Sequence, residues 1–285
     1  MNLGVTGIVI NGFNQILLIQ RDDTKTWAPP AGGMEGGELP TDTVIREVGE
    51  ETGLKVMPVR LVAFAYAYLD GGARIQLVYR CMEAGGEITP SPESPQVGYF
   101  PTKKLPEPML GLSRGQIERA VEHTGGAVWY TESVSLWLKL RIVWLKWVVY
   151  PRLARERKAR GEPEYVPAPG FKVSVAIAVR DEVNHLMWVQ QDGQSYLPTV
   201  EPPKSRSPWD AAADLAQAQF GRPVKITRLV AIYFKKEATE ALVLWEAQAK
   251  EGKGLAEIPA DADPQSRRFA EEVLENNDLV NTDWL

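Results

Sequence analysis

The chain of 285 residues contains an internal repeat, and this repeat limits the folds that are open to it. Compared with itself at an offset of 168 positions, the sequence aligns short apolar stretches that are typical of buried strands. The aligned segments and residues are 5–9 with 173–177, 60–64 with 228–232, Pro40 with Pro208, and Gly53 with Gly221. With small shifts, residues 16–20 also match 186–190. The chain is therefore predicted to hold two copies of one domain.

Each copy has the same predicted order of elements. Short strands rich in Val, Ile, Leu and aromatic residues come first, and a loop, a helix, further strands and a last helix follow. This order predicts an α/β fold in which helices flank a mixed sheet. The expected domains are 1–124 and 171–285, joined by a connector at 125–170 that begins as a Trp-rich helix and ends in a Pro-rich linker.

Composition excludes several classes of protein. Hydrophobic residues make up 44% and charged residues 24% of the chain, which is typical of a globular protein. The net charge of −5 argues against broad binding to nucleic acid, because such binding neutralises many phosphates. Cys81 is the single cysteine, so no intrachain disulfide can form, and a reducing cytoplasm is the expected location. The first residues show no secretory signal pattern.

A cluster of glutamates lies between positions 32 and 54. Glu47, Glu50 and Glu51 are three and four positions apart, so a helix would place them on one face. Like charges this close repel one another. A bound hard cation such as Mg²⁺ or Mn²⁺ explains the cluster better than a solvated surface does, because carboxylate oxygens favour such ions. Gly49 in the same stretch costs a helix about 1 kcal/mol against Ala, which disfavours a purely structural explanation.

The framework around the cluster is a known motif. Its fixed residues are Gly32, Glu38, Arg46, Glu47, Glu50, Glu51, Gly53 and Leu54. This spacing is the full Nudix box, and residues 5–123 resemble the Nudix hydrolase family. The resemblance implies a Nudix-type α-β-α sandwich for each copy. It also implies metal-dependent hydrolysis of a pyrophosphate bond in a nucleoside diphosphate linked to another moiety.

The resemblance also suggests roles for single residues. Glu50 and Glu51 are expected to bind the metal, and Glu47 is expected to act as a ligand or as the base. Arg46 would orient the glutamates through charge-assisted hydrogen bonds, with Glu38 and Gly32 as further structural supports.

A catalytic carboxylate from a later loop is also expected. Many family members place one just before an aromatic pair, and Glu93 lies six residues before Tyr99. Glu93 is as often solvated as catalytic in such a loop, and Glu83 and Glu87 are weaker alternatives.

Two residues outside the box are candidate substrate contacts. Arg21 ends the second predicted strand and could bind a phosphate, although a surface salt bridge is nearly as good an explanation. Trp27 could stack on a base, and packing beneath the loop is the equal alternative.

The second copy lacks the glutamates. At the same offset, Leu215, Ala218 and Gln219 replace Glu47, Glu50 and Glu51, so no cation cluster is expected there. Because many Nudix enzymes are homodimers, the chain could form a homodimer, or this degenerate copy could serve as a built-in partner in an intramolecular pseudo-dimer. A different class of function is also open, in which the whole chain senses nucleotides or acts as a scaffold without catalysis. The intact cluster in the first copy favours catalysis.

The segment 134–160 combines tryptophans with basic residues. Lys139, Arg141 and Lys146 interrupt its apolar stretch, so a transmembrane span is not expected. A helix packed between the two domains is the favoured explanation. A membrane-surface helix is the second alternative, and a stacking surface for nucleic acid is the third.

Overall fold

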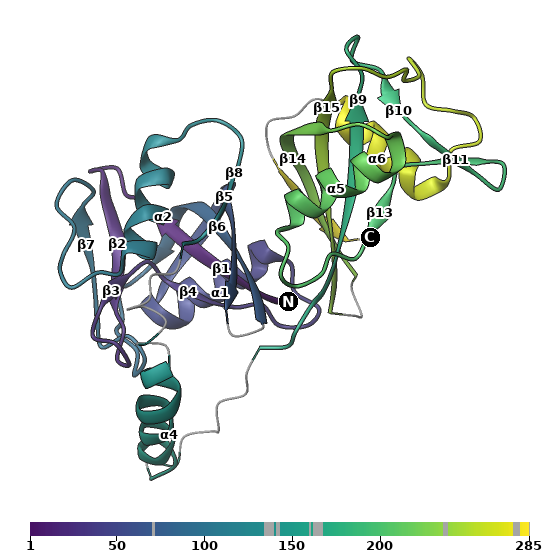
Figure 1. Cartoon of the computed structure of the whole chain (residues 1–285). Helices are drawn as coiled ribbons and strands as arrows, with labels where there is room; N and C mark the ends of the chain where they lie inside the picture. Colours follow the sequence, from purple (N-terminus) through teal and green to yellow (C-terminus); the bar gives the residue numbers. More distant parts are fainter. Residues whose placement is uncertain are drawn as a thin grey trace.

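The structure, a computed structural model, describes residues 1–69, 72–133, 140, 143–159, 161, 168–235, 239–275 and 280–284. The described part is an α/β protein whose main sheets are mixed. Figure 1 shows two bodies, one formed by each half of the chain, with α4 (Tyr150–Ala159) standing apart below the first. Among the described residues, no helix is both long enough and apolar enough to cross a membrane.

In the described part of residues 1–131, four strands precede the first helix, and three more strands separate it from the second. Its elements are β1 (Asn2–Val9), β2 (Gln15–Gln20), β3 (Trp27–Ala28), β4 (Ala31–Gly33), α1 (Pro40–Thr52), β5 (Leu54–Leu69), β6 (Gly72–Gly86), β7 (Gln96–Pro101), α2 (Gly111–Glu122) and β8 (Val128–Thr131). A π-helical stretch, η1 (Leu145–Val149), leads into α4.

The second half follows a similar order. Its elements are β9 (Lys172–Arg180), β10 (Leu186–Met187), β11 (Val189–Gln191), β12 (Gln194–Tyr196), β13 (Thr199–Val200), α5 (Pro208–Phe220), β14 (Val224–Phe234), β15 (Glu240–Ala249), α6 (Pro264–Leu274) and β16 (Asn281–Trp284).

The two main sheets share one topology. In the first half the strand order is β4-β1-β6-β5-β8, with β1–β6 and β5–β8 parallel and β5–β6 antiparallel. In the second half β9–β15 and β14–β16 are parallel and β14–β15 is antiparallel. β13 pairs with β9 as β4 pairs with β1. We propose on this basis that the second half is a diverged copy of the first.

Irregular pairings of the strands give independent support to this proposal. Two breaks in the β5–β6 register recur in the β14–β15 register exactly 168 positions later, namely Pro58/Arg60 and Leu61/Ala63 in β5, and Ile226/Arg228 and Leu229/Ala231 in β14. Bulges of this kind are kept within families because they set local twist and side-chain direction. Their shared positions favour a common origin over a chance likeness.

β9 departs from the sequence alignment by two residues. Val5 lies opposite Gly32, whereas Val175 lies opposite Val200. Val200 follows Gly32 by 168 positions, but Val175 follows Val5 by 170. Successive side chains in a strand point to opposite faces, so a displacement of two leaves every side chain on its original face. The apolar pattern therefore could not reveal the difference.

Helices cover both faces of each main sheet. In the first half, Val44 and Val48 of α1 share a buried cluster with Val5, while Ile117 of α2 shares another with Ile8. Neighbouring residues of β1 thus enter different cores, as alternation predicts. In the second half, α5 and α6 contribute to separate clusters in the same manner.

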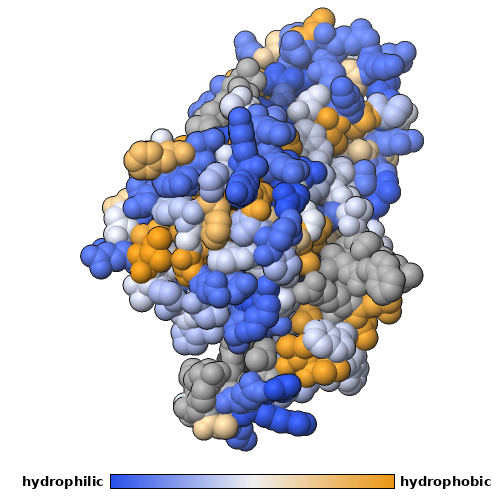
Figure 2. All heavy atoms as spheres, turned by 90° about the vertical axis from the view of Figure 1, so that its left-hand side faces the viewer, coloured by the Kyte–Doolittle hydropathy of each residue, from blue (hydrophilic) through white to orange (hydrophobic). Residues whose placement is uncertain are grey.

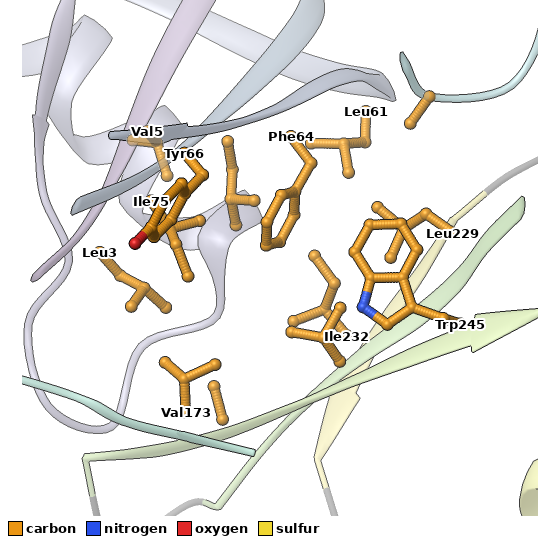
Figure 3. Packing of buried hydrophobic residues seen from close by; sticks show 14 of the residues in the cluster. Leu3, Val5, Leu61, Phe64, Tyr66, Ile75, Val173, Leu229, Ile232 and Trp245 are labelled. Atoms are coloured by element: carbon orange, nitrogen blue, oxygen red, sulfur yellow. The ribbon is translucent and has the colours of Figure 1, made fainter. Parts of the chain in front are cut away.

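One hydrophobic core spans both halves. Phe64 and Tyr66 of β5 face the second half, and Figure 3 shows Phe64 and Leu61 directed toward Ile232, Leu229 and Trp245. The Trp245 ring packs edge-on against Phe64 and Trp129, with centroids 5.7 and 5.4 Å apart. This contact supports the proposal of an intramolecular pseudo-dimer.

The region predicted to be the connector begins with a strand. β8 lies within 125–170 but forms the edge of the first main sheet, parallel to β5. Trp129, which was expected in a helix, lies in β8, because the edge of β5 offers backbone groups that a further strand can pair. The predicted first domain therefore extends past residue 124 in the structure.

The described helical part of the Trp-rich segment is largely exposed. Parts of the predicted helix and of the Pro-rich linker lie outside the described residues, namely 134–139, 141–142 and 162–167. Residues 143–159 are helical, and most of their described apolar side chains are exposed. The favoured prediction of a helix packed between domains is wrong for this part, because the aromatic cluster around Trp245 already fills the space between the halves.

Candidate active site

The glutamates are carried by α1, whose position is fixed by its ends and by a glycine beneath it. Pro40 occupies the first turn, and Gly53 ends the helix at φ 77°, in the left-handed region that glycine favours. A Cβ on Gly7 of β1 would lie 2.7 Å from Val48 Cγ2. The absence of a side chain at Gly7 thus lets α1 pack directly on the sheet through Val44 and Val48.

Arg46 is the centre of a hydrogen-bonded cluster. Its guanidinium donates to both oxygens of Glu38, at 2.8 and 3.1 Å. It also donates to Glu47 at 2.8 Å, to Glu50 at 3.3 Å and to the carbonyl of Gly33 at 3.1 Å. Hydrogen bonds to Glu38 raise the pKa of Arg46 above its ordinary value, so the side chain stays charged. One arginine therefore holds three carboxylates and the glycine loop in place.

Gly32 makes room for the carboxylate of Glu47. A Cβ at this position would lie 1.9 Å from Glu47 Cδ and about as close to both carboxylate oxygens. No side chain larger than hydrogen fits there unless Glu47 moves. The glycine therefore has a steric role in the site, which the sequence pattern did not reveal in this form.

Glu51 is the buried carboxylate of the cluster. It is 8% exposed and accepts a hydrogen bond from the Ala31 amide at 2.9 Å. Burial raises the pKa of Glu51 to about 8, and the charges of Glu47 and Glu93 add to the rise, whereas Ala31 and Arg21 oppose it. A buried carboxylate of this kind is stabilised by a nearby positive charge.

The carboxylates of α1 have the chemistry of ligands for a hard cation, and in the structure they accept hydrogen bonds from other groups of the protein. Among the described residues, no three acidic, His or Cys side chains form a ready-made metal cluster. Arg46 binds Glu47 and Glu50, and the Ala31 amide binds Glu51. The Glu50 side chain is 60% exposed, and three carboxylates beside a glycine loop match the oxygen ligands that Mg²⁺ and Mn²⁺ prefer.

Of the three loop glutamates, Glu93 is the one that acts on the cluster. Its charge raises the pKa of Glu51, and its backbone carbonyl accepts a hydrogen bond from Asp22 N at 2.9 Å. Glu83 instead accepts a hydrogen bond from Tyr99 Oη at 2.6 Å. The hydrogen bond between Asp22 and Glu93 joins the loop of Glu93 to the end of β2.

Relatives identify the family. A sequence model of the NUDIX domain matches residues 1–120. A MutT-like protein of Streptomyces ambofaciens is 35% identical over 124 residues, which are 44% of this chain and 79% of the relative. The chain belongs to the Nudix family. The 8-oxo-dGDP phosphatase NUDT18 of Mus musculus is 35% identical over 112 residues, 37% of this chain but only 34% of that protein.

Solved Nudix structures also align with part of the chain. A MutT protein from Bacillus halodurans is 24% identical with a TM-score of 0.41, covering 46% of this chain and 88% of its own. An ADP-ribose pyrophosphatase from Streptococcus suis is 24% identical with a TM-score of 0.38, covering 46% of this chain and 98% of its own.

The two candidate substrate contacts outside the Nudix box both have partners within the protein. Arg21 donates to both oxygens of Asp23, at 2.9 and 2.7 Å, and its charge also reaches Glu51. Trp27 packs edge-on against Phe100 with centroids 4.8 Å apart, and its amide donates to the Pro108 carbonyl. These arrangements correspond to the alternatives of a salt bridge and of packing beneath a loop. Arg21 still lies beside the Nudix carboxylates.

In the second half, the position of the Nudix helix is occupied by α5. Leu215 and Ala216 of α5 contribute to the shared core, and no metal cluster exists among the described residues of this half. The pair that corresponds to Glu38 and Arg46 is present with its charges exchanged, because Arg206 donates to both oxygens of Asp214 at 2.8 and 2.9 Å. The helix support remains, and the ligand chemistry does not.

Sequence reasoning missed three groups near the site. Asp23 binds Arg21 from two positions away, which local charge pairing could have indicated. The Ala31 amide is a backbone group without any sequence signal. Tyr150, in the segment treated as a connector, lies close enough to Arg21 to interact with its charge.

Proposed function

We propose that the first half catalyses metal-dependent hydrolysis of a pyrophosphate bond in a nucleoside diphosphate linked to another moiety. The observation that carries this proposal is the cluster around Arg46, in which Glu38, Glu47, Glu50 and the Gly33 carbonyl converge beside the buried Glu51. A helix that carried these charges only for solubility would not bury one of them.

Glu47, Glu50 and Glu51 would hold the metal, for which Mg²⁺ and Mn²⁺ are the candidates. When bound, such an ion neutralises phosphate oxygens and makes a bound water more acidic. The ion would also supply the positive charge that the buried Glu51 requires.

The remaining roles belong to protein groups around the cluster. Arg46 would position Glu47 and Glu50, since it donates to both. Glu47 or Glu93 would accept the proton of the attacking water. Glu93 is on a loop joined to β2 and acts on Glu51 from outside the helix, so it can approach the substrate from a second direction. Arg21 would contribute positive charge for a phosphate, and Trp27 would border the base.

The names of the relatives suggest which substrates to compare. They include an 8-oxo-dGDP phosphatase, an RNA pyrophosphohydrolase from Shewanella woodyi and an ADP-ribose pyrophosphatase. These names indicate three classes of substrate, namely damaged nucleotides, RNA ends and nucleoside diphosphate sugars. Each class has a pyrophosphate bond, which the proposed chemistry requires.

A substrate panel with identified products tests the proposal. The full chain is incubated with an oxidised purine nucleoside diphosphate, ADP-ribose, a dinucleoside polyphosphate and a 5′-triphosphorylated RNA, each with Mg²⁺, with Mn²⁺ and with chelator. We expect cleavage of at least one substrate that depends on the ion and is lost in Glu50→Gln. Tight nucleotide binding without ion-dependent cleavage of any member would favour the alternative, a nucleotide sensor or scaffold.

The cytoplasmic location remains a prediction. The single cysteine on which this prediction rests, Cys81, is free and fully buried in the structure. Burial also raises the pKa of the Cys81 thiol to about 12, so it is unreactive in a folded protein.

A further inference from the structure

The helical segment 143–159, here called the tryptophan helix, presents apolar side chains to solvent. Trp147 is 73% exposed and Trp144 is 54% exposed. Leu140, Val143, Val148 and Tyr150 are also exposed large hydrophobic residues. Scattered single residues of this kind are ordinary, but six within 11 positions form a patch that calls for a partner.

The patch continues into a basic surface. α4 exposes Arg152, Arg155 and Lys158, and the sequence of residues 152–160 holds five basic residues and one acidic residue. The whole chain has a net charge of −5, so this positively charged segment is opposite in sign to the chain as a whole. In Figure 2, orange hydrophobic atoms border blue hydrophilic atoms at the lower end of the molecule, where α4 lies in Figure 1.

We propose that the tryptophan helix docks on the surface of a bilayer that contains anionic lipids. Trp and Tyr have an apolar ring with a polar edge, which suits the boundary between headgroups and acyl chains. The adjoining arginines and lysine would lie against the negative headgroups. Along one continuous helix, the apolar and aromatic residues come first and the basic residues follow.

Two other occupants fit the surface less well. A second copy of the chain, docked symmetrically, would bring two basic runs together and oppose association by repulsion. A nucleic acid would match the basic run and could stack on the tryptophans, but Leu140, Val143 and Val148 would gain nothing from it. A bilayer is the partner that uses both the aliphatic and the basic residues.

Docking would also orient the candidate site. Tyr150 begins α4 and interacts with the charge of Arg21, whose charge in turn reaches Glu51. In Figure 1, α4 lies below the first half, which carries the glutamate helix α1. A protein held by this helix would keep its first half near the lipid surface.

Flotation of the full chain with vesicles tests the proposal. One set of vesicles contains phosphatidylcholine alone, and the other contains phosphatidylcholine and phosphatidylserine in comparable amounts. We expect binding to the second set at low salt, little binding to the first, and loss of binding as salt rises, because basic contacts with anionic lipid are screened. Each basic residue removed should weaken binding about fivefold.

Two pairs of variants separate the two contributions. Trp144→Ser with Trp147→Ser, and Arg155→Glu with Lys158→Glu, should each lower binding at least about tenfold. Phe13→Ser, at another highly exposed hydrophobic residue, and Lys250→Glu with Lys253→Glu, at exposed lysines of the second half, are the matched controls and should bind as the original protein does.

Several results would overturn the proposal. One is no binding to phosphatidylserine vesicles at low salt, and another is binding that all variants retain. Self-association that Trp147→Ser abolishes, without vesicle binding, would instead assign the patch to a second copy. Binding to single-stranded nucleic acid that outcompetes the vesicles would assign it to that partner.

Discussion

Helices α1 and α5 show which parts of the first half serve the fold and which serve the site. Both contain 13 residues, both have proline in the first turn, and both end at a glycine with φ near 70° to 80°. They differ in the residues that could bind a ligand, because α5 has Leu215, Ala218 and Gln219 where α1 has its glutamates. The scaffold therefore does not depend on the glutamates, and their presence in α1 calls for a chemical explanation.

The comparison extends to packing and to charge. Ile177 donates its amide to Pro198 as Gly7 does to Pro30, so the two residues correspond. In the first half a glycine faces two valines of α1, whereas in the second half Ile177 shares a core with Ala212 and Ala216. The larger side chains belong to the helix in the first half and to the sheet in the second half. Both arrangements fill the space between the same two elements.

The largest expected effect separates the chemistry of the two helices. Glu51→Gln keeps the shape of the side chain and an acceptor for the Ala31 amide, but it removes the buried charge. We expect turnover to fall at least about a hundredfold with the fold intact, as measured by steady-state kinetics and circular dichroism. Gln219→Ala in α5 is the matched control and should leave turnover unchanged. Equal activity in both variants would remove Glu51 from the site.

The second prediction concerns the core that the halves share. Trp245 is fully buried against Phe64, Trp129 and Trp209. Trp245→Ala should lower the free energy of unfolding by about 3–5 kcal/mol in urea titrations. Trp147→Ala, at an exposed tryptophan, should change it by less than about 0.5 kcal/mol. Equal effects of the two substitutions would show that the halves do not depend on their contact.

The third prediction compares the two exchanged ion pairs. Arg46→Ala would leave Glu38 and Glu47 half-buried without their partner and should cost about 1–3 kcal/mol of unfolding free energy. It should also lower turnover. Asp214→Ala breaks an exposed pair and should alter neither quantity measurably. A loss of stability in Asp214→Ala as large as in Arg46→Ala would mean that both pairs are structural, with no special role for the first.

The last prediction, which concerns stability alone, tests the packing of the helix on the sheet. Gly7→Ala places a methyl group 2.7 Å from Val48 Cγ2 and should destabilise the protein by about 1–3 kcal/mol. Adding Val48→Ala, which copies the residue found in α5, should restore part of this loss in thermal unfolding. Val59→Ala at an exposed position is the control second substitution. If both additions act alike, the proposed steric contact does not limit stability.

Sequence comparison located the helix more accurately than it located β9. Helix α1 and its counterpart are anchored by single residues, a proline and a glycine, whose backbone roles leave little freedom of alignment. A strand offers only alternation, and a displacement of two residues preserves it. Pairing with β13 and β15 fixed the register of β9, and only the folded sheet contains that information.

The tryptophan helix shows the same limit at the level of partners. Its residues predicted a helix that is apolar on most sides, but an apolar surface can be covered by another domain as well as by a lipid. The large aromatic side chains of Phe64, Trp129 and Trp245 fill the space between the halves, and this left the helix exposed.

The sequence alone determined the carboxylate cluster, because helical periodicity places residues three and four apart on one face whatever surrounds them. It likewise determined that the second half lacks those carboxylates. Tertiary structure decided which carboxylate is buried and how Arg46 connects the helix to the glycine loop. Those contacts join segments far apart in the chain, and their energies depend on burial and distance, which no local pattern of residues specifies.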